Sequence, residues 1–147
     1  MKTKIILFII LLQIISHSIT YASVNDTAQV KEMIIALEKS IKTHFMSNNW
    51  NKRRSVWLNV LQQSGSDFAV VKKAILQLDQ NIRMDAYKSE YQNSVADWHL
   101  YLTSADSVKL IYQALLEINQ SLDPFSREES WRSQEAKWLA KIKAGLN

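Results

Sequence analysis

The chain has 147 residues, with 18 lysines and arginines, 14 aspartates and glutamates, and no cysteine. The formal charge of +4 falls to +2 if Lys2 and Lys4 leave with an amino-terminal leader, so nucleic-acid binding is not expected. Without cysteine, an exported protein has no disulfides to stabilise it and must rely on packing.

The amino terminus has the pattern of a cleavable signal peptide. A positively charged start is followed by an apolar run from Ile5 to Ile15 and by small residues that end at Ala22. The run is shorter than the roughly 20 residues that cross a bilayer, so the membrane is expected to be contacted only through the uncleaved leader. We therefore predict a signal peptide over residues 1–22 and a single helical domain over 23–147, located in the periplasm or secreted.

The rest of the chain predicts helices, since it has few glycines and prolines and no alternating strand pattern. Apolar residues recur every three or four positions, which is typical of amphipathic helices. The first two helices are expected over about 26–46, where the stripe runs through Ile41 and Phe45, and over about 50–64. Gly65 is expected to end the second helix in a left-handed conformation.

The third helix is expected to start at Ser66 or Asp67. The sequence leaves its continuity to Leu102 unsettled, but an unbroken helix would be about 54 Å long, so we expect a break near 93–94 that is followed by a shorter fourth helix. A further helix is expected over 108–122. Ser126 and Glu129 have the spacing of a capping box that would open the last helix. These elements predict an all-α fold, an antiparallel bundle of five to six helices, and no internal repeat is evident.

Two tryptophan pairs, Trp50 with Trp57 and Trp131 with Trp138, are each spaced seven residues apart and so lie on one helix face. They could form an aromatic groove for a ligand or partner. They could also be large core side chains, which is the more usual role of buried tryptophan.

No catalytic, cofactor or metal motif is evident, and we expect a protein that is not an enzyme and carries neither a metal nor a cofactor. The histidines that follow the leader, His44 and His99, belong to no metal-binding spacing. An enzyme would require an unrecognised site built from Asp97, His99 and Glu90. Two basic clusters, 52–54 and 72–73, could be a solvated helix face or a contact surface for anionic lipid or an acidic partner.

The carboxyl-terminal third contains Ala105-Asp106, then Tyr112-Gln113 and Leu115-Leu116, and finally Ser133-Gln134 and Trp138-Leu139. This segment resembles the LprI-like lysozyme-inhibitor family of small exported helical proteins. The resemblance implies an all-helical inhibitor of a cell-wall hydrolase.

These observations predict a non-enzymatic binding protein that contacts another envelope protein, such as a peptidoglycan hydrolase, as an inhibitor or immunity factor. The alternative is a periplasmic carrier that holds a small apolar or sugar ligand between helices. The sequence leaves the oligomeric state open. The contact patch of the first hypothesis is expected among Trp50, Arg53, Arg54, Trp98, Tyr101 and Trp131. The cavity of the second is expected to be lined by Tyr91, Trp98, Tyr112 and Trp138.

Overall fold

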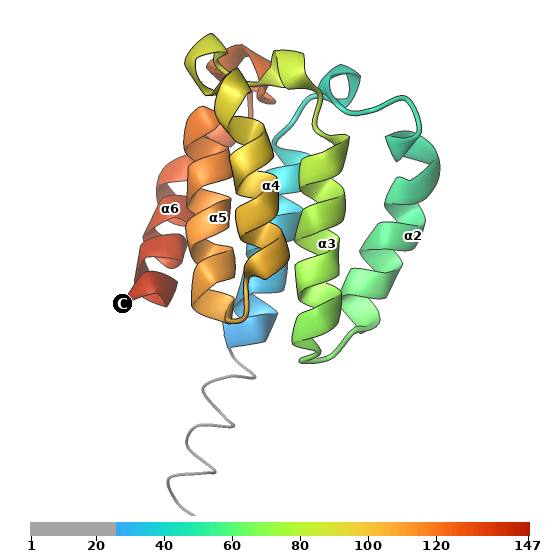
Figure 1. Ribbon diagram of the computed structural model, residues 1–147, viewed down its shortest axis with the longest axis vertical. Coiled ribbons are helices and arrows are strands. Elements are labelled where there is room, and N and C mark those ends of the chain that lie inside the picture. Colours follow the sequence, from blue (N-terminus) through green and yellow to red (C-terminus); the bar gives the residue numbers. More distant parts are fainter. Residues whose placement is uncertain (1–25) are drawn as a thin grey trace, which may run out of the picture.

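The computed structural model describes residues 26–147, so the predicted signal peptide and its cleavage site lie outside the described residues. The described chain is an all-α bundle, as predicted (Figure 1). An α-helix over 26–39 is followed by five more, which are α2 (Trp50–Gln63), α3 (Phe68–Asn81), α4 (Val95–Ser104), α5 (Val108–Ser121) and α6 (Trp131–Leu146). None of the described helices combines the length and apolarity needed to cross a membrane.

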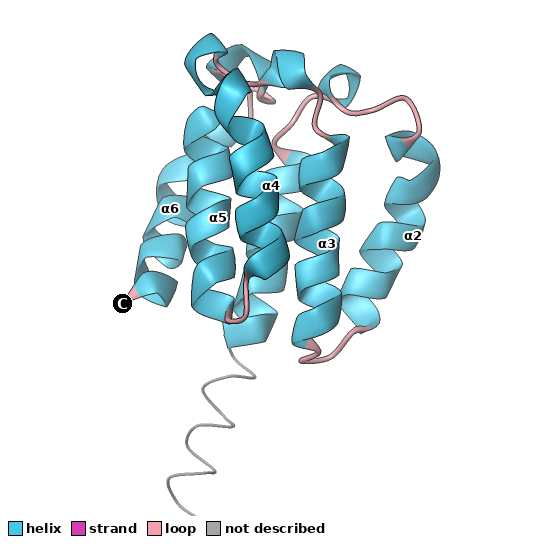
Figure 2. Ribbon diagram, in the orientation of Figure 1, coloured by secondary structure: helices cyan, strands magenta, loops and turns pink. Residues whose placement is uncertain are grey.

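The helices form three helical hairpins, which we call the first (26–63), second (68–104) and third (108–146) hairpins. Each hairpin has an inner helix, a connector containing short 3-10 turns, and an outer helix. The connectors span 40–49, 82–94 and 122–130 and gather at one end of the bundle, whereas the loops between hairpins lie at the other end (Figures 1 and 2). The bundle therefore does contain a repeat, contrary to the sequence-based expectation.

Equivalent positions are offset by 41 residues between the first and second hairpins and by 40 between the second and third. The inner helices, 26–39, α3 and α5, bury the same four positions in each hairpin. These are Val30, Val71 and Ile111; Met33, Ala74 and Ala114; Ile34, Ile75 and Leu115; and Leu37, Leu78 and Ile118. The outer helices add Trp57 and Trp138 at one position, and Leu61, Leu102 and Ile142 at another. The core is thus centred on the three inner helices.

The three connectors pair with one another in a closed ring. Isolated antiparallel bridges join Met46 to Ile82, Tyr87 to Leu122, and Arg127 back to Ile41. Backbone hydrogen bonds repeat at the three junctions with nearly equal lengths: Arg83 N to Phe45 O at 2.8 Å, Asp123 N to Ala86 O at 2.8 Å, and Lys42 N to Ser126 O at 2.9 Å. The pseudo-threefold arrangement is therefore closed, and the third hairpin contacts the first.

The ends of two predicted helices differ from the structure at the connectors, whereas the fourth helix starts next to the break predicted near 93–94. The first helix ends at 39, and Ile41 and Phe45 lie in the connector while remaining buried. The third ends at Asn81, and α4 starts at Val95 after two 3-10 segments, Met84–Ala86 and Ser89–Ser94.

At the third connector Ser126 closes a 3-10 turn over Pro124–Ser126, so the predicted capping box does not open α6. Ser130 precedes α6 without a side-chain cap. Gly65 has the predicted left-handed backbone, with φ of 58°.

Candidate binding sites

A buried polar side chain occupies the same position on each inner helix: Glu38, Asp79 and Asn119. In the first hairpin the Glu38 carboxylate accepts hydrogen bonds from Trp50 Nε1 at 3.1 Å and from Arg54 Nε at 2.5 Å. A second bond from Arg54 Nη2, at 2.8 Å, makes the ion pair bidentate. The hydrogen bond to Glu38 raises the pKa of Arg54. The Glu38 carboxylate therefore accepts hydrogen bonds from both the Trp50 indole and the Arg54 guanidinium.

In the second hairpin the equivalent residue, Asp79, pairs with an imidazole. His99 Nδ1 lies 3.1 Å from Asp79 Oδ2, and the Tyr87 hydroxyl donates to Asp79 Oδ1 at 3.4 Å. Loss of solvent raises the pKa of Asp79, although the bonds from His99 and Tyr87 oppose the shift. The other ring nitrogen of His99 is 3.0 Å from Gln80 Nε2, so both nitrogens have neighbours within the protein.

Within the described part of the chain, no hydrogen bond or ion pair joins the members of the hypothetical enzymatic site. The partner of His99 is Asp79, whereas Asp97 and Glu90 are exposed. Among the described residues, no group of three or more histidine, aspartate or glutamate side chains is placed to hold a metal ion.

In the third hairpin the equivalent residue is the amide Asn119, and it binds a buried arginine. Arg127 donates through Nη2 to Asn119 Oδ1 and to the Asn119 carbonyl, the latter at 3.1 Å, and through Nη1 to Ser40 Oγ. Its guanidinium carbon lies 5.2 Å from the centre of the Trp131 ring. Asn119 Nδ2 in turn donates to Glu135 Oε1 at 2.9 Å. Burial lowers the pKa of Arg127 to about 10, so the side chain is a cation at neutral pH.

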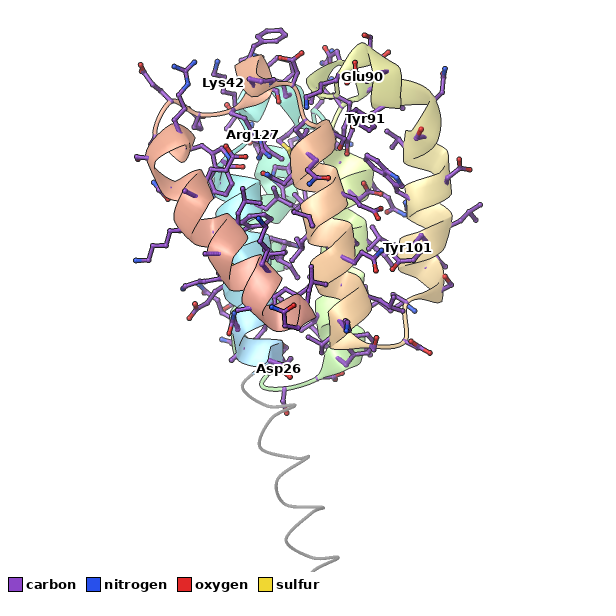
Figure 3. All side chains as sticks on the ribbon, turned by 90° about the vertical axis from the view of Figure 1, so that its left-hand side faces the viewer. Asp26, Lys42, Glu90, Tyr91, Tyr101 and Arg127 are labelled. Carbon is purple, nitrogen blue, oxygen red and sulfur yellow. The ribbon has the colours of Figure 1, made fainter. Side chains whose placement is uncertain are left out.

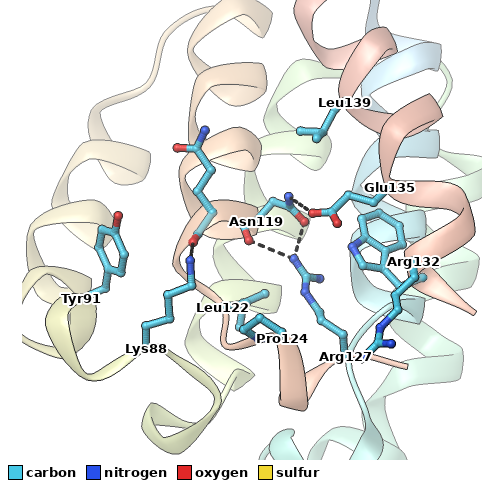
Figure 4. Close-up of a pocket in the computed structure, with 11 residues that line it drawn as sticks. Lys88, Tyr91, Asn119, Leu122, Pro124, Arg127, Arg132, Glu135 and Leu139 are labelled. Carbon is cyan, nitrogen blue, oxygen red and sulfur yellow. Dashed lines mark hydrogen bonds between the residues drawn. The ribbon is translucent and has the colours of Figure 1, made fainter. Parts of the chain in front are cut away.

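Arg127 lies in the wall of a cavity of about 430 Å³, which we call the Arg127 pocket (Figure 4). The pocket opens between the second connector and the third hairpin. Figure 3 shows Arg127 near the connector end of the bundle, with Tyr101 further along towards the opposite end. The lining residues are Lys88, Tyr91, Asn119, Gln120, Leu122, Pro124, Arg127, Trp131, Arg132, Glu135 and Leu139. Three cations and one carboxylate give this wall a net positive charge.

A second cavity, of about 580 Å³, lies between α2 and α3, and we call it the basic groove. Its base is formed by buried side chains that include Trp57 and Leu61. Val56 and Val60 line it from α2 and are 64% and 52% exposed, although both are fully apolar. The groove is therefore an apolar surface that the fold leaves open to solvent.

The charges around the basic groove all have one sign. Lys52, Arg53 and Lys73 line it and are exposed, and none of its lining residues is acidic. The equivalent groove between α6 and the first helix contains both Glu32 and Lys39, in a cavity of about 480 Å³. Uniform positive charge thus distinguishes the α2–α3 groove from its counterpart.

The residues predicted for the contact patch are distributed over all three hairpins. Trp50 and Trp131 are buried, with 2% and 4% of their surface exposed, so they are anchors of the core. Arg53 is exposed in the basic groove, and Arg54 is half-buried in its pair with Glu38.

Trp98 and Tyr101 lie half-buried on α4. Trp98 packs near Tyr91, with ring centres 6.0 Å apart, and the Tyr101 hydroxyl donates to Gln113 Oε1 at 3.1 Å. These two residues are therefore held by the second and third hairpins, away from the basic groove on α2 and α3. Sequence reasoning identified the basic clusters but not Val56. The apolar pattern predicts that Val60 faces inward with Trp57 and Leu61, and this is wrong, because Val60 is 52% exposed.

The residues expected to line a carrier cavity have different places in the described part of the chain. Tyr91 lines the Arg127 pocket, whereas Tyr112 and Trp138 are core residues with 1% and 3% exposure. The Tyr112 hydroxyl donates to the Asp26 carbonyl at 3.5 Å, and Trp138 Nε1 donates to the Met33 carbonyl at 3.1 Å. Both side chains therefore pack against the first helix.

Comparison with known families gives one match. Residues 25–87 match the family described as a domain of unknown function, DUF8799. The match covers less than half of the chain and includes the whole of the basic groove, whereas all residues that line the Arg127 pocket lie beyond it. No curated protein and no solved structure matches the chain.

Proposed function

We propose that this chain is a binding protein of the cell envelope that engages another protein through the basic groove. The observation that carries the proposal is the exposed apolar wall formed by Val56 and Val60 beside Lys52, Arg53 and Lys73. Such a surface fits a partner segment that is amphipathic, with apolar side chains on one face and carboxylates along its edges.

The apolar and charged parts of the groove contribute in different ways. Covering the exposed parts of Val56 and Val60 would stabilise a complex by on the order of 2 kcal/mol. Exposed cations contribute little to affinity individually, but together they attract an acidic segment and raise its rate of association. Salt should therefore slow association more than it accelerates dissociation.

The proposed partner class rests on the predicted leader and on the family resemblance at the carboxyl terminus. Both favour an envelope protein, and a peptidoglycan hydrolase inhibited by this chain is the specific form of the proposal. Because the groove is basic, the contacting surface of that hydrolase is expected to be acidic. A uniformly basic lysozyme would be repelled.

Binding of a designed amphipathic peptide tests the groove directly. A labelled helical peptide with leucines on one face and glutamates on its edges should bind the purified protein in fluorescence anisotropy. The triple variant Lys52→Glu, Arg53→Glu, Lys73→Glu should reduce its affinity at least tenfold, because three attractions become repulsions.

The matched control changes the same net charge elsewhere. Lys109, Lys137 and Lys143 are exposed and lie outside the groove. Changing these three to glutamate should leave peptide affinity within about twofold. Equal losses in the two triple variants would show that net charge alone governs binding and would contradict a role for the groove.

The hydrolase assignment needs its own experiment. Photo-crosslinking residues placed at position 56 or 60 should join the protein to a hydrolase in envelope extract, and the purified protein should slow peptidoglycan digestion by that enzyme. Failure to recover a hydrolase, together with unchanged lysozyme and amidase activities, would exclude the inhibitor role and leave groove binding to be judged by the peptide.

A further inference from the structure

The first and third hairpins carry the same tryptophan in different polar surroundings. Trp131 is the equivalent of Trp50, and Asn119 is the equivalent of Glu38. In the first hairpin the Trp50 indole N–H is satisfied by the Glu38 carboxylate. In the third hairpin the amide oxygen of Asn119 is occupied by Arg127.

The Trp131 indole N–H is consequently left without an acceptor. Its Nε1 is buried and makes no hydrogen bond within the described part of the chain. The indoles of Trp50, Trp57 and Trp138 each donate one, to Glu38, to the Ala74 carbonyl and to the Met33 carbonyl. Buried donors without a partner are uncommon in folded proteins, and a bound group that supplies the acceptor is one specific cause.

Arg127, beside Trp131, is a buried cation without a directly bonded carboxylate. Its exposure is 7%, its recorded hydrogen bonds go to uncharged oxygens, and it makes no ion pair with a described residue. The nearby Glu135 acts on it only through space, since that carboxylate accepts from Asn119. Buried charges are usually paired, so this position lacks an anion that the first hairpin has.

The Arg127 pocket gives access to this position and defines what fits. Lys88 and Arg132 add positive charge at its wall, and Leu122, Pro124 and Leu139 provide an apolar surface (Figure 4). Lys88 Nζ already donates to the Gln120 carbonyl at 2.6 Å, which holds its charge at the pocket. Glu135 opposes an anion but is outnumbered by three cations.

We propose that the Arg127 pocket binds the carboxylate of an organic acid whose apolar body lies against Leu122, Pro124 and Leu139. The carboxylate takes the place that Glu38 has in the first hairpin, accepting from Trp131 Nε1 and neutralising Arg127. Because the indole N–H is closed off from solvent, binding includes a side-chain shift in the pocket wall, and the exposed Arg132 is free to make it.

Two-dimensional ¹⁵N–¹H NMR of the tryptophan indole groups tests this proposal. Addition of hexanoate should move the Trp131 cross-peak, assigned with Trp131→Phe, whereas hexanamide should bind at least tenfold more weakly because it carries no charge. A short peptide ending in leucine, as the free acid and as the carboxyl-terminal amide, distinguishes a peptide terminus from a free acid as the source of the carboxylate.

The decisive variant gives the third hairpin the polar set of the first. Glu135 is the equivalent of Arg54, so Asn119→Glu with Glu135→Arg places a carboxylate and a second guanidinium beside Trp131. This double variant should keep the fold, raise the melting temperature and lose hexanoate binding. As a matched control, Glu38→Gln lies outside the pocket and should leave hexanoate binding unchanged.

The outcomes separate the proposal from its alternatives. Equal binding of hexanoate and hexanamide would show that the pocket is only an apolar cavity with no preference for a carboxylate. Unchanged hexanoate binding in the double variant would show that the ligand binds elsewhere. Either result overturns the carboxylate site. Because groove binding is measured with a different peptide on a different face, neither result bears on the proposed function.

Discussion

The buried polar residues Glu38, Asp79 and Asn119 share one structural position and differ in how their polarity is satisfied. Glu38 has a bidentate arginine, Asp79 has an imidazole and a phenol, and Asn119 has a buried arginine. Removing one partner from such a set leaves the other buried, which costs more than the hydrogen bond itself contributes. Substitutions at this position should therefore have different effects in each hairpin.

The pH dependence of stability should reveal the burial of Asp79. Its pKa in the folded protein is raised above the ordinary value of 3.8, chiefly by desolvation, so the folded state holds this proton more tightly than the unfolded chain. The resulting stabilisation is full below 3.8 and is lost as pH rises through the raised pKa. Urea unfolding between about pH 3 and about pH 7 should show this loss in the wild type, and Asp79→Asn should abolish it.

Asp85 provides a control of opposite sign for this experiment. The hydrogen bond from Arg83 lowers the pKa of Asp85, so its contribution is present above 3.8 and is lost as pH falls. Because both side chains of the pair are exposed at the surface, the effect of Asp85→Asn should be small. A profile of Asp79→Asn identical to the wild type would show that Asp79 does not titrate differently in the folded and unfolded states.

The burial of single tryptophans could be predicted only in part. The seven-residue spacing of Trp50 with Trp57 and of Trp131 with Trp138 correctly places each pair on one face, with ring centres 5.3 and 5.6 Å apart. Whether that face is core or surface depends on which helices cover it. The spacing of residues within one helix does not show which other helices cover that face.

At the level of the helices, the apolar stripes predicted the elements but not their ends. Ile41 and Phe45 continue the spacing of the first helix, yet the backbone turns extended at Lys42, with φ of −61° and ψ of 137°. The connector keeps both side chains buried, so the apolar pattern does not change where the helix ends. Hydrogen bonding to the neighbouring connectors determines that end, and these bonds join residues far apart in sequence.

The contact between α5 and α6 predicts an unusual effect of a glycine substitution. Alanine is a better helix former than glycine by about 1 kcal/mol, but a Cβ on Gly145 would lie 2.5 Å from Tyr112 Cε2. Overpacking of this kind costs about 1–3 kcal/mol, so Gly145→Ala should lower the free energy of unfolding. Chemical denaturation of the wild type and of Gly145→Ala measures this difference in the free energy of unfolding.

The same substitution should have the opposite sign when the ring is absent. In a Tyr112→Leu background, Gly145→Ala should stabilise the protein relative to Tyr112→Leu alone, because only the helix propensity remains. Destabilisation of equal size in both backgrounds would place the cause somewhere other than the ring.

For the whole molecule, the threefold repeat was the feature that sequence reasoning missed. A signal was present in the aromatic residues. Tyr91 and Trp98 have the same seven-residue spacing as the two tryptophan pairs, and they follow the first pair by 41 residues and precede the second by 40. This signal was obscured because equivalent polar positions differ in chemistry, as at Glu38, Asp79 and Asn119. Packing requires apolar residues at the shared core positions. At the polar position it accepts any group of side chains whose hydrogen bonds are satisfied. The three hairpins therefore share residue size and burial at equivalent positions rather than residue identity.

Closure of the ring predicts that the chain can be permuted. The start of the first helix and the end of α6 lie towards the same end of the bundle as the loops 64–67 and 105–107 (Figure 1). Residues 26–147, joined end to end by a short glycine-serine linker and opened within 64–67, should therefore fold with a melting temperature lowered by no more than about 10 °C.

A second permutant tests whether the connectors matter. Opened within 82–87, it interrupts two junctions of the ring and should be much less stable than the first. Equal stability of the two permutants would show that the connector ring contributes little beyond linking the helices.

The junction between Arg127 and Ile41 joins positions 86 residues apart, and the bond from Trp138 to Met33 spans 105. A chain made from its amino terminus therefore presents its first helix long before the segment that covers it exists. Until the last hairpin is made, Met33 lacks the Trp138 side chain that covers it, and a chaperone that holds the nascent chain would protect this part of the helix for most of its synthesis.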